Sequence, residues 1–349
     1  MDEEKLHAFV GRFVGDLGAV MHAGTVLIGD RLGLYRAMGD SRPVTPATLA
    51  ERTGCDERYL REWLCAQAAS GYVEYDPADG TFTLPPEQAF TLASEDNPVF
   101  VPGGLQVASS VFHDLDMLTD AYRTGRGVPW GDHHVELFAG TCRFFRANYI
   151  GNLVGNWIPA LDGMEERLRA GAHVADVGCG LGSSTLLMAG AFPASTFVGY
   201  DSHRPSVDGA AKIAAEAGLA NVRFERADAD DFPGRDHDMV TVFDALHDMG
   251  DPVGVASHIR ESLAADGTML LVEPYAGDRV EDNLTPVGRV FYSASSAICT
   301  PNSRSQPVDR ALGAQAGEAR LRDVATEAGF TRFRRAAETP FNLVLEARP

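Results

Sequence analysis

Apolar positions in the C-terminal half of the chain alternate between a strand-like and a helix-like pattern. The short apolar runs, which are typical of buried strands, lie at residues 173–177, 196–201, 222–228, 238–246 and 269–273. Segments with helical spacing separate these runs, beginning with residues 183–191. Because strands that alternate with helices form parallel sheets, the pattern predicts an α/β domain. Two final runs, at 330–339 and 341–348, predict a hairpin.

The N-terminal part of the chain predicts helices followed by a hairpin. Apolar residues between 17 and 32 recur at helical spacing, so we expect an amphipathic helix that buries its apolar stripe. Shorter helices are expected between residues 45 and 54 and between 56 and 71. Strands at 72–75 and 81–84 flank a turn with Asp-Gly. This order predicts a winged helix.

Composition limits the classes of partner. The 349 residues exceed the usual size of one core, so two or three modules are expected. The formal net charge of −19 disfavours nucleic acid and anionic membranes. Acidic residues also outnumber arginines between residues 45 and 75, so the winged helix lacks the basic stripe of a DNA reader.

Five cysteines without a C-x-x-C pair favour a reducing compartment and no structural metal. The first residues lack the order of a signal peptide, and no run approaches the length of a membrane span. We therefore expect a cytoplasmic protein without a metal.

A glycine-rich turn follows the strand at 173–177. Asp176 precedes three alternate glycines, Gly178, Gly180 and Gly182. A dinucleotide fingerprint would instead have its third glycine at the position of Ser183. Glycines let a nucleoside approach the main chain closely. An acidic residue beside them suits a positively charged amino-acid head better than a pyrophosphate, which it would repel.

This stretch resembles motif I of class I S-adenosylmethionine-dependent methyltransferases. Nearly the whole chain is similar to bacterial members with an N-terminal winged helix, including small-molecule O-methyltransferases and uncharacterised actinobacterial relatives. The resemblance implies a Rossmann-like domain with a seven-stranded, mostly parallel sheet at 170–349, a winged-helix dimerisation domain at 1–95, and a helical connector at 96–169. It also implies a lid-like insertion at 275–317, S-adenosylmethionine as cofactor and a homodimer.

The spacing of acidic residues indicates how such a cofactor is held. Asp201 ends a strand about 20 residues after the glycines, where an acceptor for ribose hydroxyls is expected, although it could instead cap a helix. The resemblance places the adenine amino group at Asp228, which could also belong to a solvated acidic loop. The expected cofactor contacts are Tyr149, Asp176, Gly178, Cys179, Gly180, Gly182, Asp201, Ser202, Asp228, Ala229, Phe232 and Asp244.

Methyl transfer to a hydroxyl needs a base, and histidine titrates in the useful range. Leu246, His247 and Asp248 are similar to the stretch that carries the catalytic histidine in winged-helix O-methyltransferases. The resemblance implies that Glu273 orients His247; alternatively, His247 is a polar loop residue beside the cofactor.

Aromatic residues between 97 and 169 and the long connection at 275–317 suggest walls for a small, partly apolar substrate, because ligand sites form at domain junctions. Most of the aromatic residues should be ordinary core. His133 and His134 form a second candidate pair, with Glu136 to orient one of them. The expected substrate contacts are His133, His134, Phe138, Phe144, Phe145, Trp157, Arg289 and Tyr292.

The leading interpretation is O-methylation of a small metabolite in natural-product biosynthesis. Transfer to carbon or nitrogen would not need His247. A regulator that senses the cofactor and binds DNA through its winged helix is disfavoured by charge. An NAD-dependent oxidoreductase is disfavoured by Ser183 and Asp176.

Overall fold

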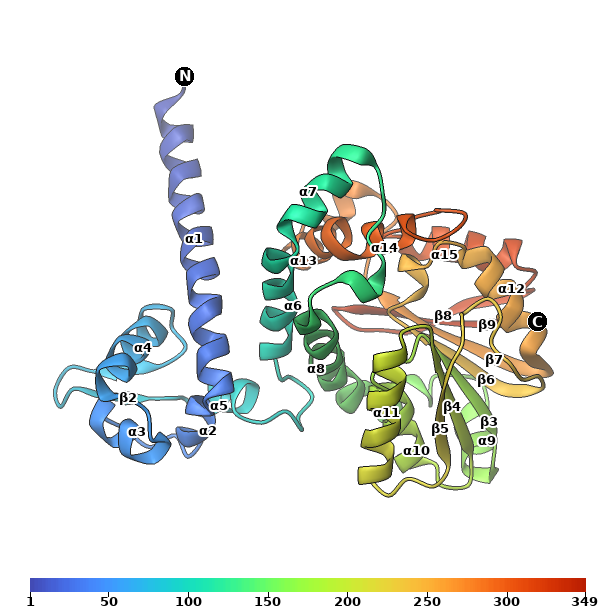
Figure 1. Cartoon of the computed structure of the whole chain (residues 1–349), viewed down its shortest axis with the longest axis horizontal. Helices are drawn as coiled ribbons and strands as arrows, with labels where there is room; N and C mark the ends of the chain where they lie inside the picture. The colour runs from blue at the N-terminus through green and yellow to red at the C-terminus, as the bar shows by residue number, and fades with distance from the viewer. The chain divides into compact units, whose positions relative to one another are not determined.

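The computed structural model describes residues 1–349 and divides the chain into two compact units. One unit holds residues 1–109 and 139–147, and the other holds residues 110–138 and 148–349. The chain therefore divides differently from the predicted modules, since the segment at 96–169 contributes to both units (Figure 1). Each unit is described by itself.

The larger unit is built on a seven-stranded sheet. Its strands are β3 (His173–Val177), β4 (Thr196–Asp201), β5 (Val222–Arg226), β6 (His237–Phe243), β7 (Leu263–Pro274), β8 (Arg332–Glu338) and β9 (Asn342–Arg348). Their order is β5-β4-β3-β6-β7-β9-β8, and β9 runs antiparallel to both of its neighbours. This confirms the predicted mostly parallel sheet. The order reverses between β3 and β6, where ligands of such sheets bind.

Helices pack on the sheet because its central strands are apolar throughout. Residues such as Val177, Val242 and Leu271 are completely buried or nearly so. The sheet helices are α9 (Met164–Ala170), α10 (Ser183–Ala191), α11 (Arg204–Glu216), α12 (Pro252–Ser262) and α15 (Gly317–Glu327). Helices α10 and α11 contact β4 and β5, whereas α12 contacts β7 and α15 (Figure 1).

The connection at 275–317 is helical, in contrast to the expectation of a structureless lid. It contains η4 (Val280–Asn283), α13 (Pro286–Ala294), the π-helical segment η5 (Ser295–Cys299) and α14 (Thr300–Arg304). Apolar residues at helical spacing, such as Phe291 and Ile298, are buried there and explain the order.

The segment before the sheet is helical, as predicted. Its elements are α6 (Pro102–His113), α7 (Leu115–Thr124), η1 (Trp130–Asp132), α8 (Val135–Asn152) and the π-helical η2 (Leu153–Trp157). Within the sheet domain, the short η3 (Leu246–Asp248) follows β6. No helix of the structure is both long and apolar enough to cross a membrane.

The smaller unit confirms the winged helix. Its elements are α1 (Glu3–Arg31), α2 (Leu34–Ala37), α3 (Pro46–Thr53), α4 (Glu57–Ala69), β1 (Glu74–Asp76), β2 (Thr81–Thr83) and α5 (Pro86–Leu92). The side chains of Thr45 and Asp56 cap α3 and α4. Within this chain the predicted apolar stripe of α1 is covered only in part, since Leu27 is buried whereas Leu17, Val20 and Met21 are exposed.

Candidate active site

The glycine-rich turn joins β3 to α10 at the reversal point of the sheet. Gly178, Gly180 and Gly182 all have φ between 54° and 78°, a left-handed backbone that favours glycine. A Cβ on Gly182 would lie 2.6 Å from the ring of Phe224, whereas one on Gly180 would meet no atom within 4 Å. The main chain at Gly180 is therefore open to a ligand.

Asp176 lies behind this turn and does not face it. Its carboxylate is completely buried and accepts hydrogen bonds from Ser184 Oγ at 2.7 Å, Thr185 Oγ1 at 2.6 Å and Thr241 Oγ1 at 2.8 Å. Burial raises the pKa of Asp176. Hydroxyl groups on α10 and β6 thus bind this carboxylate, which ties both elements to β3, and the predicted contact of Asp176 with a cofactor stays a prediction.

Asp201 and Asp228 lie at neighbouring strand ends in different environments. Asp201 accepts hydrogen bonds from the N–H of Gly180 and of His203, both at 2.8 Å. Asp228 is exposed just beyond β5. The structure therefore brings Asp201 to the glycine turn and leaves Asp228 in solvent, so the three predicted carboxylates do not converge.

The other predicted cofactor residues divide between core and surface. Phe232 is buried, with its ring 5.2 Å from that of Tyr200, so it belongs to the core and not to an open site. Ala229 packs partly buried against the same cluster, and Ser202 is exposed. Cys179 is buried within the turn, and burial raises the pKa of its thiol.

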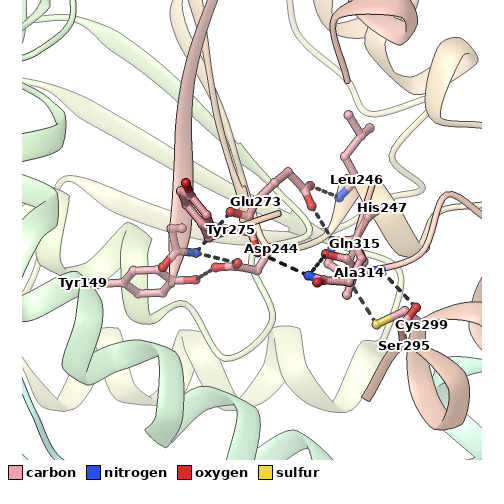
Figure 2. A network of polar contacts seen from close by, with 11 residues as sticks. Tyr149, Asp244, Leu246, His247, Glu273, Tyr275, Ser295, Cys299, Ala314 and Gln315 are labelled. Atoms are coloured by element: carbon pink, nitrogen blue, oxygen red, sulfur yellow. Dashed lines mark hydrogen bonds and ion pairs between the residues drawn. The ribbon is translucent and has the colours of Figure 1, made fainter. Parts of the chain in front are cut away.

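Asp244 forms a polar group with Tyr149 at the end of β6 (Figure 2). Its carboxylate accepts hydrogen bonds from Tyr149 Oη at 3.3 Å and from Asn342 Nδ2 at 2.8 Å. Burial and the charge of Glu273 raise the pKa of Asp244 well above its ordinary value. The structure thus brings together Tyr149 and Asp244, as the sequence suggested, and adds Asn342 from β9.

Beside Asp244, His247 lies between an acid and a thiol (Figure 2). Its Nδ1 contacts the Glu273 carboxylate, whose other oxygen accepts the N–H of Leu246 at 2.9 Å. Its Nε2 lies 3.3 Å from Cys299 Sγ. Because a carboxylate only accepts, Nδ1 carries a proton and Nε2 offers a lone pair. The contact between His247 and Glu273 has the geometry that the sequence predicted.

The loop of His247 packs directly on the glycine turn. A Cβ on Gly178 would lie 3.1 Å from the Cβ of Ala245 and 3.6 Å from Cε of Met249. The imidazole is therefore attached to the same end of the sheet as the turn. This places a base candidate beside a candidate ligand site.

Burial and the neighbouring groups shift the pKa of His247 in opposite directions. Burial alone would lower the pKa of His247, but Glu273 and Cys299 outweigh it and raise this pKa well above its ordinary value. Burial raises the pKa of neighbouring Asp248 to about 7. Ligand atoms of His247, Asp248 and Cys299 lie within 4.8 Å of one another, a spacing that would also admit a metal ion.

The partner of His133 is Asp114, whereas Glu136, predicted to orient either His133 or His134, contacts His134 through its backbone N–H. His133 Nδ1 lies 2.9 Å from Asp114 Oδ2, and His133 Nε2 is buried without a hydrogen-bond partner. His134 instead stacks on His113 at 3.9 Å and accepts the N–H of Glu136 at the start of α8. Sequence reasoning missed Asp114 because it lies 19 residues away, between α6 and α7.

The predicted substrate residues are scattered. Trp157 is buried against Tyr149 and Phe243, so it is core. Phe138 is partly buried, with its ring 4.5 Å from that of His203.

The remaining four of these residues do not form one group. On α13, Arg289 is exposed and Tyr292 is partly buried. Phe144 and Phe145 belong to the smaller unit.

Comparisons with known protein families match two separate parts of the chain. Residues 21–94 match the family described as "Rv2258c-like winged HTH domain", and residues 168–318 match "Methyltransferase domain". In sequence, the chain is 32% identical over 110 residues to an uncharacterized methyltransferase, YcgJ, of Bacillus subtilis, covering 31% of this chain and 43% of that protein. The chain spans less than half the length of the curated relatives that it first matches.

Solved structures extend the similarity in fold to nearly the entire chain. The mitomycin 7-O-methyltransferase MmcR has a TM-score of 0.69 and 20% identity, with 99% of this chain and 100% of that chain covered. Human N-acetylserotonin methyltransferase in complex with SAM has a TM-score of 0.71 and 15% identity, with 97% of both chains covered.

Proposed function

We propose that this chain, whose residues 21–94 match a winged helix-turn-helix domain and whose residues 168–318 match a methyltransferase domain, transfers a methyl group from S-adenosylmethionine to a hydroxyl oxygen of a small, partly apolar metabolite. The observation that supports transfer to oxygen is the buried contact between His247 and Glu273 on a loop that packs against Gly178. Transfer to carbon or to an already ionised group would not need this pair.

The residues around the turn fit S-adenosylmethionine. The open main chain at Gly180 admits a nucleoside, and Asp201 beside it can accept from ribose hydroxyls. Asp228 and Ser202 are exposed and free to move towards an adenine. The carboxyl of Asp244, with Tyr149, would face the amino-acid end. When bound, this cofactor supplies a methyl group on a positively charged sulfur.

His247 acts as the general base in this proposal. As the acceptor oxygen takes the methyl group, its proton must leave, and Nε2 is the atom that can receive it. Glu273 holds the Nδ1–H tautomer and stabilises the imidazolium that forms. Most of the remaining rate enhancement comes from holding the reactants in line.

We also propose that His133 contacts the acceptor. Its Nε2 is buried without a partner, while Asp114 fixes the ring through Nδ1. The neighbouring rings of Trp130 and Phe138 would contact an apolar part of the acceptor. The net charge of −19 supports an acceptor other than nucleic acid, and a natural product is the class that we propose.

Two experiments test this function in sequence. Calorimetry with S-adenosylhomocysteine should show binding to the full chain, and a screen of hydroxyl-bearing metabolites with labelled S-adenosylmethionine should reveal turnover. His247→Gln should then lower kcat by about 10²–10⁴-fold with S-adenosylhomocysteine affinity retained. Activity within a few-fold of wild type would exclude His247 as the base, and transfer only to carbon or nitrogen would contradict O-methylation.

A further inference from the structure

Cys299 occupies the position that a substrate of His247 would need. Its Sγ lies 3.3 Å from His247 Nε2, the lone pair that a general base must offer to the acceptor (Figure 2). Both side chains are buried, with residue exposures of 7% for Cys299 and 4% for His247. A hydroxyl cannot reach this lone pair directly while the thiol lies on it.

Hydrogen bonds on both sides of the contact hold the thiol in place. Cys299 ends the π-helical segment η5, a type of helix that often marks functional sites. Directly after it, Asn302 Nδ2 donates to the carbonyl of Asp248 at 3.1 Å and Ser303 Oγ donates to that of Met249 at 2.9 Å. The N–H of Gly313 donates to the carbonyl of His247 itself. The segment that carries Cys299 is thus fastened to the loop that carries the base.

A thiol beside an imidazole that a carboxylate orients is an arrangement in which the imidazole can take the proton of the thiol. Glu273 fixes the proton of His247 on Nδ1, so Nε2 can accept only from Cys299. We propose that Cys299 is a further catalytic residue, which takes the acceptor's proton and passes its own to His247. This inference depends on the proposed O-methylation.

The step balances without another reactant. The acceptor O–H bond breaks and its proton binds Cys299 Sγ, while the proton of the Cys299 thiol moves to His247 Nε2. The acceptor oxygen uses the freed electron pair for its new bond to the methyl carbon, and the methyl–sulfur electron pair stays on the donor sulfur. Cys299 ends as a thiol, and the positive charge ends on His247 beside Glu273.

This relay also narrows the class of acceptor. A thiol has a reference pKa of about 8.5 and a phenol one of about 10, so proton transfer between them is nearly balanced. An aliphatic alcohol is far less acidic and would give up its proton to sulfur only at a large cost. The structure therefore favours a phenolic or enolic hydroxyl as acceptor.

Cys299→Ala and Cys299→Ser, in the full chain, test the relay with an acceptor found in the screen. We expect Cys299→Ala to lower kcat by at least about 10²-fold with little change in KM, and Cys299→Ser to retain more activity, since a hydroxyl can still donate to Nε2. Cys65→Ala, at an exposed cysteine, is the matched control and should behave as wild type. Unchanged or increased kcat in Cys299→Ala would show that the thiol merely covers the base and would overturn the relay.

A second measurement needs no acceptor. In ¹⁵N-labelled protein, the Nε2 resonance of His247, identified by its loss in His247→Gln, should shift in Cys299→Ala and stay fixed in Cys65→Ala. An unshifted resonance would exclude the contact and the relay with it. Loss of activity in His247→Gln but not in Cys299→Ala removes only the relay, whereas activity retained in both variants removes the proposed base as well. Melting temperatures and S-adenosylhomocysteine binding identify any variant that fails to fold.

Discussion

At the scale of single residues, the site depends on where one positive charge can reside. Asp244, His247 and Glu273 share a small region at the ends of β6 and β7. Two carboxylates so close cannot both ionise cheaply, and the pKa of Asp244 is raised by burial and by the charge of Glu273. Of these two carboxyl groups, Glu273 is the one that pairs with His247. This division leaves Asp244 as a neutral hydrogen-bonding group and makes His247 the stronger base.

Glu273→Gln tests this division through pH dependence. Glu273 raises the pKa of His247, and the base is active only when unprotonated, so kcat/KM of wild type should rise with pH through a midpoint above 6.5. Removing the charge should move this midpoint to lower pH and reduce the plateau by about 10²-fold or more, as expected when a base loses its orienting acid. Initial rates from pH 5 to 10 measure both effects.

The matched control for this prediction is Glu281→Gln. Glu281 is exposed on η4 and pairs with exposed Arg279, so its substitution should leave the profile unchanged. A midpoint that stays in place in Glu273→Gln would show that Glu273 does not set the basicity of His247.

Sequence and structure agree on the pair of His247 and Glu273 for a simple reason. His247 follows β6 and Glu273 lies at the end of β7, and because these consecutive strands are neighbours in the parallel part of the sheet, chain order alone brings the two residues together. Cys299 belongs to the long connection that was expected near the substrate, but its contact with His247 could not be predicted, because it depends on how residues 275–317 fold. The partners of Asp176 were not predicted: Ser184 and Thr185, only eight and nine residues later, donate hydrogen bonds to its carboxylate.

At the scale of elements, two distant segments form a wall beside the base. The loop between α7 and α8 is attached to α14, where Val128 N–H donates to the carbonyl of Pro301 at 2.8 Å and Trp130 N–H donates to Asn302 Oδ1 at 3.1 Å. Asn302 also bonds Asp248, so one side chain links the His133 loop to the His247 loop. Where the loop between α7 and α8 comes closest to the end of α14, it carries a glycine, Gly127, which has no side chain.

Gly127→Ala should detach this loop. A Cβ at residue 127 would lie 1.9 Å from the backbone nitrogen of Ser305, which cannot move without disturbing α14. We expect a loss of about 1–3 kcal/mol in stability and a raised KM for the acceptor, while S-adenosylhomocysteine affinity is kept because the glycine turn is elsewhere. Denaturation and calorimetry on one preparation measure both quantities.

Gly190→Ala is the control for this prediction. Gly190 lies in α10 with nothing within 4 Å of its Cβ position, so alanine should be neutral or stabilise the helix by about 0.5–1 kcal/mol. Equal behaviour of the two alanine variants would mean that the loop accommodates the added atom and is not held as described.

At the scale of the molecule, the sheet could be predicted from its alternating pattern, whereas the surroundings of α1 could not. Amphipathicity shows that a stripe is apolar, but it does not identify what covers that stripe. In the structure, the N-terminal turns of α1 extend beyond the other helices of its unit (Figure 1). Large side chains there are exposed, among them Phe9 at 61% and Met21 at 70%. Such a stripe on a water-soluble helix indicates an interface.

We predict that the stripe pairs with that of a second copy, giving the homodimer expected from the sequence. In a two-fold dimer each substitution acts twice, so losing one large apolar contact of about 1.5–3 kcal/mol per chain should weaken association by about 10²–10⁴-fold. Phe13→Asp should therefore give monomers in sedimentation equilibrium at concentrations where wild type is dimeric. Arg12→Ala, a neighbouring exposed position, should leave the dimer intact. A monomeric wild type would show that α1 has a different partner. Catalysis by such a monomer should be independent of protein concentration, because His247, Glu273 and Cys299 all come from one chain.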